Sequence, residues 1–339
     1  MKLSTPRWWY ERHNAARRGS MPIARALLTP ISWIWAAVTA RRIARTTPFD
    51  PGVPVICVGN LTLGGAGKTP IVRALAERLA ARGQVVHLLS RGYGGNVEGP
   101  IRVDCARHTS ADVGDEPLML ARDYPVWVSR DRAAGAKAAA EAGAQVIVMD
   151  DGHQNPSVKK ALSLVVVDGE TRGESWPFGD GRVFPAGPMR EPLAVGLARA
   201  ESVVILLPAD LAEADRELSA MLKGPDQLTA HLRPVAPPPP GPQVGFAGIG
   251  MPWKVERALQ AAGCELADFA PFPDHVVYSE AILKRLADRA AQFDAGLVTT
   301  EKDWVRLPPE WRTHVTAWLV QVVFDNPAAL DALLATIDL

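Results

Sequence analysis

The feature that most constrains this chain is a glycine-rich segment between an apolar run and a helical pattern. The apolar run at residues 55–58 predicts a buried strand, and residues 71–79 carry apolar side chains at helical spacing. Between them stands Gly-Gly-Ala-Gly-Lys-Thr, residues 64–69. Glycines let backbone N–H groups curl around an anion, and the following helix adds the positive end of its dipole. The segment therefore predicts a phosphate-binding loop and a bound nucleoside triphosphate.

The loop departs from the usual pattern at one position. G-x-x-x-x-G-K-[ST] requires glycine where this chain has Thr62, and the Gly64-Gly65 pair makes a variant of it. The alternative is an ordinary strand-to-helix turn, but Lys68-Thr69 stands in register and both flanking elements agree. We expect Lys68 to reach the β- and γ-phosphates and Thr69 to offer its hydroxyl to Mg²⁺. The predicted nucleotide-binding residues are Thr62, Leu63, Gly64, Gly65, Ala66, Gly67, Lys68 and Thr69.

Composition limits the class of protein. A length of 339 residues suits about two domains, and 47% apolar with 22% charged residues is typical of a folded chain. The net charge is zero, so bulk electrostatics do not indicate a nucleic-acid partner. The three cysteines are scattered without metal-ligand spacing, which indicates buried thiols in a reducing compartment.

Residues 1–46 form a basic, tryptophan-rich segment. Trp8, Trp9, Trp33 and Trp35 lie there, and lysine and arginine far outnumber acidic residues. Its uncharged stretch, residues 26–40, is shorter than the roughly 20 apolar residues of a spanning helix, and Pro30 interrupts it. We expect an amphipathic helix lying in a membrane interface, with arginines toward anionic headgroups. The alternative is that its apolar side chains pack on the protein core.

The rest of the chain alternates strand and helix patterns. Residues 47–232 predict an α/β core of the P-loop NTPase type, a parallel sheet with helices on both faces. Residues 233–242 are proline-rich and predict a stiff connector that forms neither helix nor central strand. Residues 243–339 predict a second, smaller α/β domain, with a strand at 317–322 and a helix at 327–337. Whether the first sheet takes a strand from the second domain stays open.

Two aspartates follow an apolar run downstream of the phosphate loop. Residues 146–149 predict a strand that delivers Asp150 and Asp151 to the carboxyl edge of the sheet. A carboxylate there holds Mg²⁺ directly or through water, so Thr69, Asp150 and Asp151 are the predicted metal ligands. A simple turn at Asp151-Gly152 would also explain the pair.

Further candidates have ordinary explanations as well. Asp115 follows Gly114 at a predicted helix start, which favours helix capping. His275 lies in a loop, where a lone histidine is commonly structural, although transfer of phosphate to a hydroxyl needs a carboxylate that a histidine can orient. Four arginines are candidate anion ligands, and each could equally be a solvated surface charge: Arg91, Arg130, Arg132 and Arg190.

Taken together, these segments resemble the tetraacyldisaccharide 4′-kinase family over nearly the whole chain. The segments that carry the resemblance, after the tryptophan-rich N-terminus, are Gly59-Asn60-Leu61-Thr62, Gly64-Gly65-Ala66-Gly67-Lys68-Thr69-Pro70, Ser90-Arg91-Gly92-Tyr93-Gly94, Gly114-Asp115-Glu116-Pro117, Asp150-Asp151-Gly152-His153-Gln154, Pro185-Ala186-Gly187-Pro188-Met189-Arg190-Glu191, Phe272-Pro273-Asp274-His275 and Thr300-Glu301-Lys302-Asp303.

The resemblance implies an enzyme of lipid A biosynthesis in Gram-negative bacteria. It would transfer the γ-phosphate of ATP, with Mg²⁺, to the 4′-hydroxyl of a tetraacylated glucosamine disaccharide 1-phosphate, giving lipid IVA. It would sit peripherally on the cytoplasmic face of the inner membrane, with no nucleic acid and no obligate protein partner. Asp115 would then be the base, assisted by His275, with Lys68 as a third catalytic group. The substrate-binding candidates are Arg91, Tyr93, Arg130, Arg132, Gln154 and Arg190.

Two other classes of function remain as alternatives. A soluble ATPase switch commonly carries lysine before the glycine pair, where this chain has Leu63, and rarely has such an N-terminus. A nucleotide-gated membrane adaptor would not need the loops that carry Asp115 and His275. Because His275 belongs to the second predicted domain, closure of the two domains is a hypothesis for how the site is completed.

Overall fold

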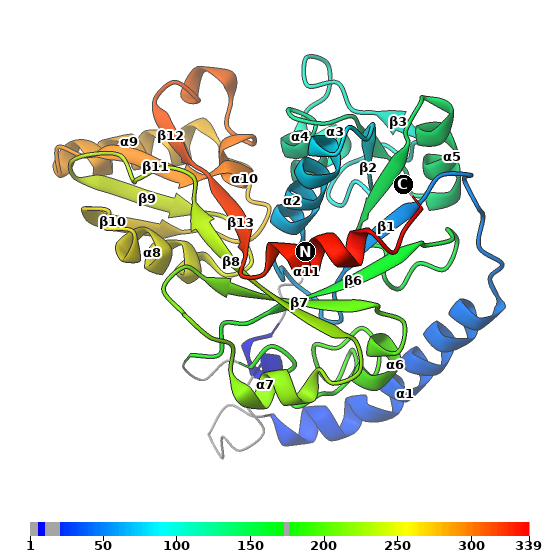
Figure 1. Ribbon diagram of the computed structural model, residues 1–339. Helices are drawn as coiled ribbons and strands as arrows, with labels where there is room; N and C mark the ends of the chain where they lie inside the picture. The colour runs from blue at the N-terminus through cyan, green and yellow to red at the C-terminus, as the bar shows by residue number, and fades with distance from the viewer. Residues whose placement is uncertain (1–5, 11–20, 173–175, 339) are drawn as a thin grey trace.

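The computed structural model describes residues 6–10, 21–172 and 176–338, and contains two sheets (Figure 1). The first is nine-stranded, and its strands from β8 to β4 run parallel, with an antiparallel strand at each edge. Its order is β13 (Val320–Phe324), β8 (Asp226–Pro234), β7 (Ser202–Pro208), β6 (Leu162–Asp168), β1 (Val55–Gly59), β5 (Val146–Asp150), β2 (Val86–Ser90), β4 (Val126–Val128) and β3 (Ile101–Arg102). This sheet and its helices are called the large unit below.

Helices cover both faces of this sheet because successive strand residues point to opposite sides. In β1, Ile56 and Val58 pack under helix α2, whereas Val55 and Cys57 face helix α5. The helices of the large unit are α2 (Lys68–Ala81), α3 (Ser110–Val113), α4 (Asp115–Leu120), α5 (Arg132–Glu141), α6 (Leu193–Leu197) and α7 (Arg216–Met221). The predicted P-loop NTPase-type core is therefore confirmed.

The small unit is built on a parallel sheet of four strands. Their order is β10 (Leu266–Pro271), β9 (Gln243–Ala247), β11 (Gly296–Thr300) and β12 (Val315–Trp318). The accompanying helices are α8 (Pro252–Ala261), α9 (Glu280–Gln292), α10 (Glu301–Trp304) and the short 3₁₀ turn η2 (Pro309–Trp311). Phe246, Tyr278 and Leu283 lie at the centre of its core.

The chain then returns to the large unit, which answers the question that the sequence left open. The strand predicted at 317–322 is in fact two strands in two sheets, β12 and β13, with Leu319 between them. Strand β13 pairs antiparallel with β8, and helix α11 (Pro327–Leu334) follows it (Figure 1). Leu330 and Leu334 of this helix are buried in the large core. The predicted boundary of 243–339 therefore places β13 and α11 in the wrong unit.

The predicted connector also differs at its start. Strand β8, which the sequence did not predict, runs through Arg233 to Pro234, and Pro234 lies opposite Val320. Pro234 can end a strand because it only removes one donor from the ladder. The proline-rich link that leaves the sheet is therefore shorter and covers residues 235–242.

Helix α1 (Pro22–Arg45) runs along one side of the large unit (Figure 1). The helix continues through Pro30, contrary to the predicted interruption. Its burial is inverted: Ser32 and Thr39 face the protein, whereas Leu27, Trp33 and Ile34 are at least 65% exposed. In the described part of the chain, it is the one helix that is long and apolar enough to cross a membrane. The 3₁₀ turn η1 (Arg7–Tyr10) precedes it, and residues 1–5 and 11–20 of the predicted segment lie outside the described residues.

Candidate active site

The phosphate loop connects β1 to α2 as predicted. Gly67 caps α2 in the left-handed region at φ 75°, and a side chain there would collide with Leu206, at 2.3 Å from its Cδ2. The loop rests on the 183–190 segment: the N–H of Leu63 donates to Pro188 O at 2.8 Å, and Thr62 forms a β-bridge with Met189. These contacts fix the loop at the carboxyl end of β1, directly before the N-terminus of α2.

Charged side chains from three elements meet beside this loop. Lys68 Nζ lies 3.6 Å from Asp151 Oδ1, and Arg190 Nη1 donates to the same oxygen at 2.9 Å. Burial acts against ionisation of Asp151, but the charges of Lys68 and Arg190 outweigh it and lower its pKa to about 2. Gln154 joins the group, since its Oε1 accepts from Arg190 at 3.4 Å. Asp151 therefore stays ionised and holds both cations in place.

Asp150 lies in a different environment from its neighbour. It is 3% exposed, and its Oδ1 is buried without a hydrogen-bond partner in the described part of the chain. Burial, followed by the negative charge of Glu116, raises the pKa of Asp150 well above its usual range. Such an orphaned carboxylate oxygen fits a hard divalent cation, which prefers oxygen ligands. Among the described residues, no group of three or more acidic, histidine or cysteine side chains is arranged to hold a metal ion.

A carboxylate–histidine pair spans the two units. Asp115 begins α4, and its Oδ2 lies 2.7 Å from His275 Nδ1, in the loop after β10. The favoured capping interpretation of Asp115 is wrong, because Gly114 occupies the N-cap position and no side chain caps α4. Burial opposes ionisation of Asp115, but the hydrogen bond from His275 and the charge of Arg306 lower its pKa below the usual value.

The neighbouring Glu116 links this pair to the phosphate loop. Its Oε1 lies 3.0 Å from Lys302 Nζ of the small unit. Burial opposes its ionisation, whereas the charges of Lys302 and Lys68 lower its pKa. Because the charge of Lys68 acts on Glu116, the start of α4, where Asp115 also lies, is within electrostatic range of the phosphate loop.

The predicted substrate residues do not all gather here. Tyr93 is exposed and its ring centroid lies 5.5 Å from that of His275, so it borders the site. Arg91 is exposed and directly follows β2. Arg132 is buried and donates to the backbone oxygen of Asp150 at 2.9 Å, so it holds the end of β5 and is not a surface anion ligand. Arg130 pairs with Glu98 on the surface at 3.0 Å.

Sequence reasoning missed several residues of the site. Arg306 contacts Asp115, and Tyr10 donates from its hydroxyl to the backbone oxygen of Leu63 in the phosphate loop. The aromatic run at residues 8–10 was a signal for the second contact, since aromatic side chains seldom cluster without packing on something. Arg306 stands apart from every motif, and nothing in the pattern pointed to it.

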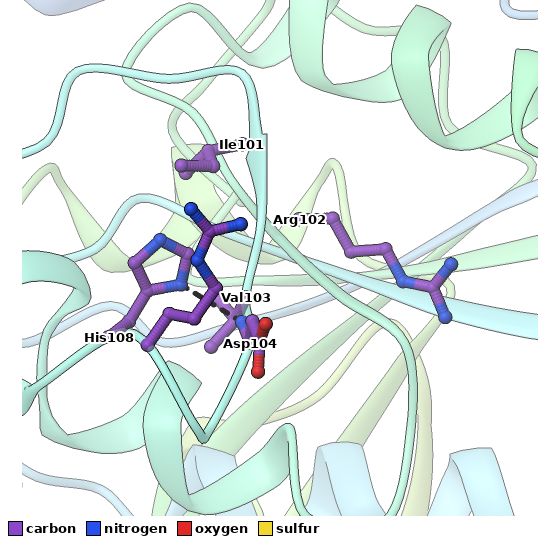
Figure 2. A pocket seen from close by; sticks show the side chains of 6 residues that line it. Ile101, Arg102, Val103, Asp104 and His108 are labelled. Carbon is purple, nitrogen blue, oxygen red and sulfur yellow. Dashed lines mark hydrogen bonds between the residues drawn. The ribbon is translucent and has the colours of Figure 1, made fainter.

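A cavity of about 710 Å³ lies elsewhere, beside the edge strand β3 (Figure 2). Strands β5, β2 and β4 separate it from β1. In Figure 2, Arg102 points away from His108, whose Nδ1 accepts from the N–H of Asp104 at 2.9 Å. Its lining residues are Ile101, Arg102, Val103, Asp104, Arg107 and His108, none of which the sequence predicted for the site. We therefore place the candidate active site at the phosphate loop.

The fold and this site define a P-loop nucleotide-binding protein with a carboxylate–histidine pair beside the loop. The family model described as tetraacyldisaccharide-1-P 4′-kinase matches residues 24–338, so the chain belongs to that family of kinases, which transfer phosphate to a hydroxyl. A protein named tetraacyldisaccharide 4′-kinase from Phenylobacterium zucineum is 71% identical over 332 residues, covering 98% of each chain. One of the same name from Caulobacter vibrioides is 67% identical over the full length of both.

A solved structure has the same fold. It is described as the "apo" form of LpxK from Aquifex aeolicus in complex with ATP. The two structures align with a TM-score of 0.72 at 25% sequence identity, over 92% of this chain and 98% of that one. The predicted family and fold class are thus confirmed.

Proposed function

We propose that this protein transfers the γ-phosphoryl group of ATP to the 4′-hydroxyl of a tetraacylated glucosamine disaccharide 1-phosphate, giving lipid IVA. The observation that carries the proposal is the Asp115–His275 pair beside the phosphate loop. An ATPase that activates water could use such a pair too, but the family and the printed names of its relatives favour a sugar hydroxyl as acceptor.

The residues of the site have complementary roles in this proposal. The loop from Thr62 to Thr69 and the ammonium group of Lys68 bind the triphosphate and offset its charge. The acceptor hydroxyl attacks the γ-phosphorus, the bond from that phosphorus to the β,γ-bridging oxygen breaks, and the hydroxyl proton passes to Asp115. His275 orients the carboxylate, and ADP leaves.

Mg²⁺ is part of this proposal. Thr69, Asp150 and Asp151 would hold it, and it supplies charge neutralisation on the phosphate oxygens. The orphaned Oδ1 of Asp150 supports this assignment. Asp151 is ionised, because its pKa is lowered to about 2, and Mg²⁺ bound beside it would lower the raised pKa of Asp150 in turn.

We also propose that α1 holds the protein on the cytoplasmic face of the inner membrane. Its large apolar side chains point outward, while Trp35 Nε1 donates to Arg190 O at 3.3 Å and Arg42 Nη2 donates to Gln154 O at 3.3 Å. The exposed apolar face is therefore attached directly to residues of the site. A substrate whose acyl chains stay in a bilayer could reach the site along this face, with Arg91, Tyr93, Gln154 and Arg190 at its border.

The test is transfer of labelled γ-phosphate from ATP to a tetraacyl disaccharide 1-phosphate in detergent micelles. We expect Asp115→Asn to lower kcat by about 100-fold or more, since a positioned general base contributes on the order of 10²–10⁴. The matched control is Asp268→Asn, which removes a carboxylate that pairs with Arg289 in the small unit. Release of free phosphate regardless of lipid, with no labelled lipid, would instead indicate an ATPase switch.

A further inference from the structure

The segment from Thr300 to Arg306 has no role in the proposed chemistry, yet it reaches the large unit at three points. Glu301 accepts two hydrogen bonds from Arg73 of α2, at 2.6 and 2.9 Å. Lys302 pairs with Glu116, and Arg306 Nε lies 2.8 Å from Asp115 Oδ2. The small unit therefore presents one cation to each of the first two carboxylates of α4.

Arg306 is the more buried of these two cations. Its side chain is 4% exposed, and its Nη1 donates to Gly248 O at 2.9 Å and to Asp303 Oδ1 at 3.1 Å. Its Nε and Nη2 are both buried with no hydrogen-bond partner in the described part of the chain, so the contact of Nε with Asp115 is a close ion pair without hydrogen-bond geometry. A guanidinium is charged at every pH that a protein tolerates, so burying it needs fixed negative partners.

Asp303 supplies a rigid anchor for this guanidinium. It is fully buried, and its Oδ1 also accepts from the N–H of Gly248 at 2.9 Å and from the hydroxyl of Tyr278 at 2.7 Å. Burial, followed by the charge of Asp303, raises the pKa of Tyr278 above its usual range, so that hydroxyl remains a donor. The position of Arg306 is thus fixed from within the small unit.

The two carboxylate oxygens of Asp115 have different surroundings. His275 Nδ1 and Arg306 Nε both contact Oδ2, at 2.7 and 2.8 Å. Among the described residues, none donates a hydrogen bond to Oδ1. We propose that Arg306 is a positioning residue for the general base: it fixes Asp115 through Oδ2 and leaves Oδ1 to accept the proton of the acceptor hydroxyl. This inference rests on the proposed role of Asp115.

The charges around Asp115 agree with this arrangement. The groups that face Asp115 are His275, Arg306, Lys302, Tyr278 and its neighbour Glu116. Burial raises the pKa of Asp115, but the hydrogen bond from His275 and the positive charges outweigh burial, so the pKa is lowered. A weakly basic carboxylate suits a loose transition state, in which little proton removal precedes transfer and geometry matters most. Arg306 supplies that geometry with a charge that does not titrate, which His275 alone cannot do.

The experiment compares kcat as a function of pH for wild type, Arg306→Gln and Arg306→Lys, with Arg289→Gln as control. Arg289 also pairs with an aspartate of the small unit. We expect Arg306→Gln to lower kcat by about 10- to 100-fold, since a misplacement of about 1 Å costs on the order of 10². Loss of the charge raises the pKa of Asp115, so the acid limb of kcat moves to higher pH. KM for ATP stays within about twofold.

The lysine variant separates charge from geometry. Arg306→Lys keeps the positive charge, so we expect the wild-type acid limb. We expect a lowered kcat, because an ammonium group cannot contact Asp115, Asp303 and Gly248 at once as the planar guanidinium does. If thermal unfolding shows that Arg306→Gln does not fold, Arg306→Lys becomes the test. A wild-type kcat in Arg306→Lys would then contradict the proposal. An unmoved acid limb in a folded Arg306→Gln would also overturn it.

Asp115→Asn, assayed alongside, tells the two proposals apart. If Asp115→Asn retains transfer, the assignment of the base itself falls, and the role of Arg306 falls with it. If Asp115→Asn is inactive while Arg306→Gln behaves as wild type, only the positioning role is lost.

Discussion

Single residues in this site act through ion pairs that join separate elements. Lys68 of α2 is placed by Asp151, which follows β5, and Asp151 is placed in turn by Arg190 from the loop before α6. Because Asp151 keeps its charge down to a pH of about 2, this chain of contacts persists at every working pH. Lys68, which we propose binds the triphosphate, is therefore held in position before any substrate arrives.

Replacing Lys68 tests this arrangement. We expect Lys68→Ala to lower kcat by about 100-fold or more, because one preorganised charge on the transferred group contributes several kcal/mol. Labelled phosphate transfer measures this effect, and thermal unfolding checks the fold. The control is Lys137→Ala, which breaks only an exposed pair with Glu141 on α5. Equal activity of the two variants would remove Lys68 from the mechanism.

The sequence predicted these residues unevenly. Lys68, Thr69 and the Asp150-Asp151 pair were predictable because local pattern places them: a loop between strand and helix, and the end of a buried strand. Asp115 looked like a helix cap because capping is also local, and only the family resemblance indicated a base. Arg306 was not predictable, since its partner comes from another unit and no spacing links the two residues.

At the scale of elements, the period of the apolar residues predicts whether a segment is a helix or a strand better than it predicts which element the segment pairs with. The interior strands β1, β5 and β11 were predicted well, because buried parallel strands are continuous apolar runs. The run at 317–322 was misjudged, since periodicity does not tell which sheet a strand joins. Strand β8 was missed because it mixes exposed polar and buried apolar residues and ends in proline.

Helix α1 shows the same limit in another form. Its composition was evident, but its orientation was not, because Ser32 and Thr39 face the protein and the apolar side chains face outward. A helix with this burial is unusual in water and is typical of a membrane contact.

A flotation assay with anionic phospholipid vesicles tests α1. We expect the double variant Trp33→Glu with Ile34→Glu to lower vesicle binding by about tenfold or more, since each large apolar side chain moved from water into lipid contributes about 1.5–3 kcal/mol. Val235→Glu is the control, because Val235 is also exposed but lies in the link between units. The melting temperature should be unchanged, and undiminished binding would exclude α1 as the attachment site.

At the scale of the whole molecule, the two units meet around the site. Besides the contacts of α4 with His275, Lys302 and Arg306, Arg257 of α8 pairs with Glu170 after β6 at 3.2 Å. The covalent links are the 235–242 segment and Leu319. A site built across two units that are joined so narrowly depends on their separation.

Solution scattering measures that separation. We expect a non-hydrolysable ATP analogue with Mg²⁺ to reduce the radius of gyration, because triphosphate at the loop attracts the cations of the small unit and so favours the closed arrangement described here, in which they contact α4. Lys68→Ala should respond only at higher analogue concentration. An identical scattering profile with and without analogue would count against the hypothesis that closure completes the site.

The return of β13 and α11 to the large sheet has a consequence for the making of the protein. While the ribosome is still translating the small unit, β8 remains an open edge, and the apolar surface that Leu330 and Leu334 later cover stays exposed. A nascent chain that stops before β13 keeps both features, which chaperones and proteases recognise. The large sheet can therefore be completed only after the small unit, which carries His275 and Arg306, has been synthesised.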